Sequence, residues 1–209
     1  MEWSNILAGI ITFLVLTIGL PLALRKRKKS GPQNVEQLLH HLLEIGVKAS
    51  MAEKGVDEEK VGASRSFMRR SESVIKIEGR NVDYINVISV ASQYGVHYFI
   101  DYLVTSPSLP GKKKRKKTKM VTKKSSRIRG RVVDIEWKGD DYLSRELNFD
   151  YQLKDKLLQA ELGKLSGSIW IFPEMKKYEY ARVRTSYLLP SSDLFEAIEI
   201  ISGHIKSGW

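Results

Sequence analysis

Residues 3–24 form a run of 22 residues without a charged side chain, and most of them are apolar. A helix that rises about 1.5 Å per residue crosses the roughly 30 Å hydrocarbon layer of a bilayer at this length. The five residues that follow are all basic: Arg25, Lys26, Arg27, Lys28 and Lys29. The run therefore predicts a single transmembrane helix, with Trp3 where membrane proteins place interfacial aromatic side chains.

Three other interpretations of the apolar run fit less well. A secretory signal peptide carries its positive charge before the apolar core and ends in a small-residue cleavage site, neither of which occurs here. A mitochondrial presequence is amphipathic and Arg-rich, and a buried core helix is not followed by five basic residues. Because cytoplasmic flanks carry the excess of Lys and Arg, we expect the N-terminus outside and residues 25–209 in the cytoplasm. The absence of Cys fits a reducing compartment.

The net charge of +11 is concentrated in two segments. The five basic residues after the apolar run form the first. The second, here called the polybasic segment, spans residues 112–131 without an acidic side chain and contains twelve basic residues: Lys112, Lys113, Lys114, Arg115, Lys116, Lys117, Lys119, Lys123, Lys124, Arg127, Arg129 and Arg131. Without these seventeen charges the chain has a net charge of −6, so the body of the protein is mildly acidic.

Mutual repulsion among so many like charges predicts that residues 107–131 form an exposed, disordered loop. The loop could simply be a solvated insertion. If the loop is a contact segment, anionic lipid headgroups are its first candidate partner, since each basic residue near such a surface contributes about 1 kcal/mol to binding. An acidic protein is the second candidate and nucleic acid the third, because the segment lacks the aromatic side chains on which single-stranded bases stack.

Hydrophobic periodicity divides the rest of the chain into a linker with an amphipathic helix at 30–72 and a globular domain at 73–209. Strands are expected at residues 74–78, 82–91, 96–104, 132–137, 168–172 and 178–188, although 82–91 also has a helical interval. Helices are expected at 35–47, 142–162 and 193–206. Consecutive strands without intervening helices predict an α+β fold, with an antiparallel sheet and helices packed on one face.

Signs of catalysis are weak, so we expect no enzyme, cofactor or metal. The chain has no P-loop, dinucleotide, nucleophile-elbow or zinc-protease motif and no Cys. His97 and Asp101 share a strand face but lie about 13 Å apart, too far for a base and its orienting acid. Glu136, Asp140 and Asp141 could hold a metal, yet a polar turn with an Asp cap for the next helix fits better.

The sequence therefore predicts a single-pass membrane protein whose cytoplasmic domain acts as an adaptor or accessory subunit. Its polybasic segment would contact anionic lipid or an acidic partner. One alternative is a membrane-tethered, nonspecific nucleic-acid-binding protein. A second is a small-molecule-binding or hydrolytic domain whose site the sequence does not reveal.

Overall fold

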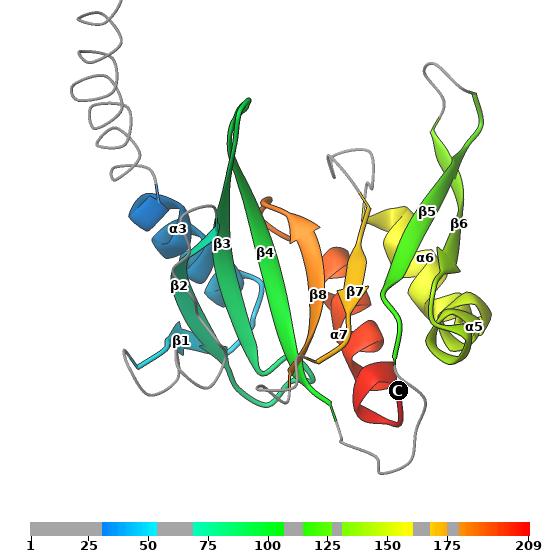
Figure 1. Ribbon diagram of the computed structural model, residues 1–209. Helices are drawn as coiled ribbons and strands as arrows, with labels where there is room; N and C mark the ends of the chain where they lie inside the picture. The colour runs from blue at the N-terminus through cyan, green and yellow to red at the C-terminus, as the bar shows by residue number, and fades with distance from the viewer. Residues whose placement is uncertain (1–30, 54–68, 107–114, 127–130, 161–167, 175–179) are drawn as a thin grey trace, which may run out of the picture. The chain divides into compact units, whose positions relative to one another are not determined.

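Eight strands pair side by side in one sheet (Figure 1). The computed structural model describes residues 31–53, 69–106, 115–126, 131–160, 168–174 and 180–209. The strands are β1 (Ala49–Met51), β2 (Arg69–Ile77), β3 (Tyr84–Ser92), β4 (Gly95–Thr105), β5 (Thr118–Lys124), β6 (Val132–Lys138), β7 (Trp170–Phe172) and β8 (Tyr180–Ser186). Their order across the sheet is β1-β2-β3-β4-β8-β7-β5-β6, and every neighbouring pair is antiparallel.

The described residues also form four helices: α3 (Gly31–Glu44), α5 (Asp141–Phe149), α6 (Tyr151–Gln159) and α7 (Ser192–Lys206). This confirms the expected α+β class with an antiparallel sheet. The chain divides into two units, Met1–Gln37 and Leu38–Trp209, and the sheet with α5, α6 and α7 belongs to the second. No helix among the described residues is long and apolar enough to span a bilayer. The predicted anchor at 3–24 lies outside those residues.

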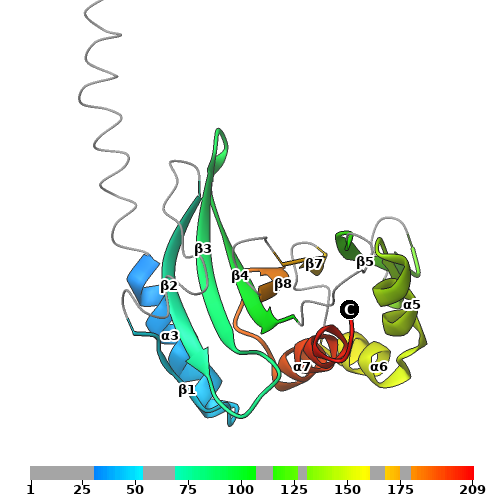
Figure 2. The ribbon, with the colours of Figure 1, turned by 60° about the horizontal axis from the view of Figure 1, so that its bottom comes forward.

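Helix α7 provides the centre of the core because its apolar stripe faces the middle of the sheet. Leu194, Ile198 and Ile201 are almost fully buried, and the ring of Phe195 meets that of Tyr102 on β4 edge to face, with centroids 6.5 Å apart. Helix α6 packs beside α7, and Figure 2 shows both on the same side of the sheet. The opposite sheet face carries no helix of the second unit within its described residues.

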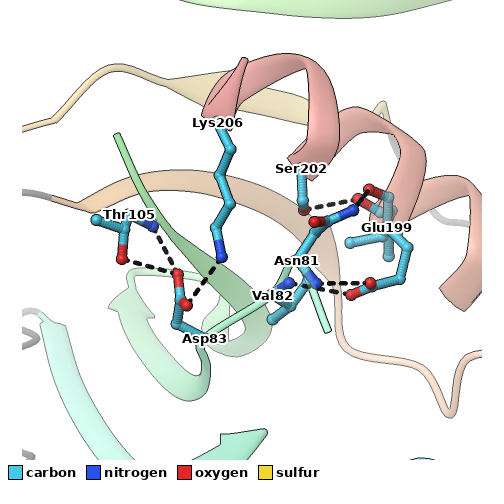
Figure 3. Close-up of polar contacts among 8 residues, drawn as sticks. Asn81, Val82, Asp83, Thr105, Glu199, Ser202 and Lys206 are labelled. Carbon is cyan, nitrogen blue, oxygen red and sulfur yellow. Dashed lines mark hydrogen bonds and ion pairs between the residues drawn. The ribbon is translucent and has the colours of Figure 1, made fainter. Parts of the chain in front are cut away.

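Polar contacts fasten the second half of α7 to the turn between β2 and β3 (Figure 3). The carboxylate of Glu199 accepts hydrogen bonds from the backbone N–H groups of Asn81 and Val82, at 2.8 and 3.0 Å. Lys206 donates to Asp83 at 3.0 Å, and Asp83 also accepts from the backbone of Thr105 at 2.7 Å. The backbone N–H groups of the turn therefore have hydrogen-bond acceptors, and the same contacts fix the position of α7 against the sheet.

The prediction of a disordered loop across residues 107–131 is wrong for its central part. Residues 118–124 form strand β5, which pairs with β6 on one side and β7 on the other. Alternation at the start of the strand explains the difference: Thr118 and Met120 are fully buried, and Lys119 between them is exposed. Lys123 and Lys124 are exposed at the end of the strand, where the register shifts. Repulsion among the lysines is tolerable because the strand sends them to water and keeps only uncharged side chains in the core.

Two further boundaries differ from the sequence prediction. The helix expected at 142–162 is divided into α5 and α6 at Asp150, whose backbone is extended and whose side chain accepts from Leu153 N at 2.8 Å. The segment expected as a linker at 30–72 includes the predicted amphipathic helix, α3, but also contributes β1 and the start of β2 to the sheet. The segment 82–91, which the sequence analysis expected as a strand but which also has a helical interval, forms strand β3 from Tyr84 onwards.

Candidate functional site

The register of the sheet lines up one residue from each of six strands on the face opposite α7. Cross-strand pairing joins Lys138 to Lys119, Lys119 to Trp170, Trp170 to Arg184, Arg184 to Asp101, and Asp101 to Asn86. Directly opposed residues of paired strands project from the same face. The row thus brings together residues of β6, β5, β7, β8, β4 and β3 that are far apart along the chain.

Asp101 lies at the centre of this face and is fully buried. Arg184 donates to it through Nε at 2.6 Å and through Nη2 at 2.8 Å, in a bidentate ion pair. Arg69, from the first residue of β2, donates its Nη2 to the same carboxylate at 3.1 Å. Charge-assisted, bidentate pairs of this kind fix the planes of the guanidinium groups.

A third arginine, Arg182, lies two residues before Arg184 on β8 and therefore shares its face. Its Nε atom is buried and has no hydrogen-bond partner among the described residues. Burial lowers the pKa of Arg182; Asp101 opposes this effect, and the charges of Arg69 and Arg184 add to it. Burial likewise lowers the pKa of Arg69, again against the influence of Asp101. The three guanidinium groups therefore lie close enough to repel one another.

Two lysines of the polybasic segment extend the positive charge along the same face. The ammonium of Lys117 lies 3.5 Å from the centroid of the Trp170 ring and 4.7 Å from that of Phe172. The ammonium of Lys119 lies 5.6 Å from the Trp170 centroid. The pKa of Lys117 is lowered by burial first and then by the charges of Arg184 and Lys119. Cation–π contact holds these lysines beside the arginines in spite of their repulsion.

We call this group the sheet-face cluster: Arg69, Asp101, Lys117, Lys119, Arg182 and Arg184. Five of its six members are cations, and Asp101 is the one carboxylate with which any of them forms an ion pair among the described residues. The guanidinium carbon of Arg184 lies 5.6 Å from the Phe99 centroid and 5.0 Å from that of Phe172. The arrangement can bind and orient an anion, since its donors are fixed and its positive charge exceeds its negative charge.

The described part of the polybasic segment divides between structural and surface roles. Arg115 has a side chain only 9% exposed, donates to Glu174 at 2.8 Å and lies over the ring of Trp209. Lys123 pairs with Asp134 at 3.2 Å. Lys116, Lys119, Lys124 and Arg131 are exposed. Outside the described residues lie Lys112, Lys113, Lys114, Arg127 and Arg129, together with Trp3 and Arg25 to Lys29.

Of the acidic residues considered as a metal or acid–base site, Asp140 has a structural role. Asp140 accepts from the backbone N–H groups of Tyr142 and Leu143, both at 3.2 Å, and thereby caps α5 as the turn interpretation predicts. Its other oxygen accepts from Lys116 N at 3.0 Å, which ties the start of β5 to the helix. No group of metal-ligating side chains occurs among the residues that the structure describes.

Sequence reasoning missed the three arginines of the cluster. Arg69 lies in the segment that the sequence analysis assigned to a linker, and a pair of basic residues there does not by itself indicate a binding site. The alternation Arg182-Val183-Arg184 in a strand with buried Ala181, Val183 and Thr185 was a usable signal, because it places two guanidinium groups on the second face of an internal strand. Nothing in the local sequence indicates that Asp101 lies opposite Arg184.

Comparisons of the chain with protein families, curated proteins and solved structures found no match to any of them.

Proposed function

We propose that the chain is a single-pass membrane protein whose cytoplasmic α+β domain binds an anionic partner without acting on it chemically, as an adaptor or accessory subunit does. The observation that carries the proposal is the excess of positive charge in the sheet-face cluster. Two half-buried guanidinium groups, of Arg69 and Arg184, pair with one carboxylate; Arg182 lies near them without an ion pair of its own among the described residues, and Lys117 and Lys119 lie beside them. An additional anion would stabilise this arrangement by offsetting the desolvation of the cations.

The burial of Asp101 and the donor-only character of the other cluster residues favour a binding role over a catalytic one. Asp101, the acid of the cluster, is buried under two arginines and is not available as a general base. The other members are donors only, which suits recognition of a negatively charged group. The anchor at residues 1–29 and the polybasic segment complete the proposal: the first holds the domain at the membrane, and the exposed lysines of the second would contact anionic lipid or an acidic protein.

The central claim can be tested by anion-dependent stabilisation. The full chain in a nonionic detergent would be unfolded thermally in a titration with polyphosphate at constant ionic strength. We expect Tm to rise with polyphosphate, and the rise to shrink in Arg182→Gln, since ligands that bind only the native state stabilise it. Arg145→Gln, on helix α5, removes the same charge away from the cluster and should leave the rise unchanged. A rise equal in both variants, or no rise, would refute the proposal.

The role of the polybasic segment in membrane contact needs its own measurement. The full chain reconstituted in neutral vesicles should capture a second population of anionic vesicles, and capture should fall as salt rises because exposed charges are screened. Replacing Lys123 and Lys124 by Gln should weaken capture. Capture that is insensitive to both salt and these replacements would remove the lipid contact from the proposal.

A further inference from the structure

The structure supplies the polybasic segment with the aromatic rings that its own sequence lacks. Strand β7 lies next to β5 and carries Trp170 and Phe172. The ammonium of Lys117 lies within about 5 Å of both ring centroids, and that of Lys119 lies 5.6 Å from the Trp170 centroid. Phe99 adds a third ring on β4, over Arg184. The absence of stacking platforms was the argument against single-stranded nucleic acid, and the tertiary fold removes that argument.

The cluster also has the extent that a polymer needs. From Phe99 on β4 to Lys119 on β5 this face crosses three strand-to-strand intervals, about 14 Å at roughly 4.8 Å each. Charged and flat groups lie close together along this line, because the guanidinium carbon of Arg184 is 5.6 and 5.0 Å from the Phe99 and Phe172 centroids and Trp170 pairs with Arg184 across the strands. Guanidinium planes and aromatic rings both stack on bases, while ammonium groups bind the phosphates between them.

Other anionic partners match these features less well. A bilayer surface meets protruding charges, whereas Arg182 and Arg184 are half-buried near the middle of the sheet and Asp101 beneath them is inaccessible. An acidic peptide would use the cations but would leave Trp170 and Phe172 without a flat partner. A single strand of nucleic acid uses both kinds of group and is narrow enough to follow the row of side chains.

We infer that the sheet-face cluster binds single-stranded nucleic acid across strands β4, β8, β7 and β5, with Trp170 and Phe172 stacking on bases and Lys117, Lys119 and Arg182 contacting phosphates. The inference rests on the proposed function, since it names the anion that the cluster takes. A base that stacks on Trp170 displaces the Lys117 ammonium, which lies 3.5 Å from the ring centroid in the free protein. The displaced ammonium then pairs with the adjacent phosphate and escapes the repulsion of Arg184 and Lys119.

Fluorescence anisotropy with a labelled oligothymidylate of about 12 nucleotides, within the length that one such site covers, tests the inference on the full chain in nonionic detergent. Trp170→Leu should weaken binding about 10-fold, which corresponds to the loss of one base–aromatic stack. Tyr94→Leu removes an exposed aromatic ring at the β3–β4 turn and should leave the affinity unchanged. Phe172→Leu is the second stacking variant if Trp170→Leu lowers Tm.

The outcomes separate this inference from the proposed function. One outcome keeps the anion site and overturns the nucleic-acid inference. In it, polyphosphate stabilises the chain through Arg182, the oligonucleotide binds no tighter than polyphosphate of equal charge, and Trp170→Leu and Phe172→Leu bind the oligonucleotide with normal affinity. Tighter binding of a poly-glutamate peptide than of the oligonucleotide would overturn it in favour of an acidic protein. If no anion binds, both proposals fail. Oligonucleotide binding that depends on Trp170 or Phe172 and on Arg182 supports both.

Discussion

Replacing Asp101 by Asn removes the one carboxylate that holds the sheet-face cluster together while preserving the size of the side chain. In the native protein this carboxylate is fully buried and accepts two hydrogen bonds from Arg184 and one from Arg69, at 2.6, 2.8 and 3.1 Å. The amide of Asn keeps one oxygen acceptor but carries no charge, and its NH₂ group would face guanidinium donors. The variant therefore leaves three arginines without an opposing charge.

The expected loss follows from the cost of breaking a buried ion pair, about 3–5 kcal/mol when one partner is removed. Arg69 and Arg184 keep partial access to water, with side chains 37% and 17% exposed. The loss should therefore lie near the lower end, at about 3 kcal/mol in the free energy of unfolding. For a chain of 209 residues, about 2–4 °C per kcal/mol converts this into a decrease in Tm of roughly 6–12 °C.

The assay is thermal and urea unfolding of the full chain in nonionic detergent, compared with Asp141→Asn. Asp141 is 95% exposed and its ion pair with Lys116 is long, at 3.9 Å, so its replacement should change stability by less than about 0.5 kcal/mol. Polyphosphate should recover part of the loss in Asp101→Asn, because an added anion replaces the missing carboxylate among the arginines. A loss below about 1 kcal/mol would refute the reasoning, since the guanidinium groups would then not depend on Asp101.

Three further replacements test other contacts of the fold. Gly139→Ala should destabilise the protein by about 3 kcal/mol in urea unfolding, because φ is +141° and a Cβ atom would lie 2.1 Å from the carbonyl oxygen of Lys117. An unchanged urea midpoint would contradict this close approach. Glu199→Ala removes two charge-assisted hydrogen bonds to the β2–β3 turn (Figure 3) and should cost about 2 kcal/mol, with faster amide exchange at that turn. Two lysine hydrogen bonds lower the pKa of Asp134 to about 2, so its contribution to stability is complete above about pH 4 and is lost as the pH falls towards 2. Asp134→Asn should flatten this part of an acid-unfolding curve followed by fluorescence, whereas the exposed Asp155→Asn should not.

Local patterns in the sequence were sufficient for much of the fold. Runs of β-branched and aromatic residues predicted β4 and β8, and the helical stripe with its Asp193 start predicted α7. The buried residues of β8 follow the period of two, whereas β4 buries five consecutive residues at 100–104. The Asp140 cap was also predicted, because a carboxylate directly before an apolar helical period satisfies the first free N–H groups wherever the helix packs. These features depend on neighbours within a few residues.

Strand β5 shows where a local rule failed. Charge density alone indicated a disordered loop, since only a few of the residues around Met120 are apolar. The strand forms because β6 and β7 pair with it on both sides and bury Thr118 and Met120. Backbone pairing and two buried side chains outweigh the repulsion of lysines that remain in water, and neither pairing partner is visible in the segment's own sequence.

The sequence by itself determined the distribution of charge: a basic flank after an apolar run, a polybasic segment and an acidic remainder. Only the tertiary structure decided which charges meet. Strand β8 inserts between β4 and β7, so Arg184 reaches Asp101 across 83 residues of chain and Trp170 comes to lie against Lys117. Strand order and register arise from the packing of the whole sheet on α7, and no local period encodes them. The positive charge that the sequence assigned to a loop is therefore, in part, a fixed and aromatic-lined surface of the sheet.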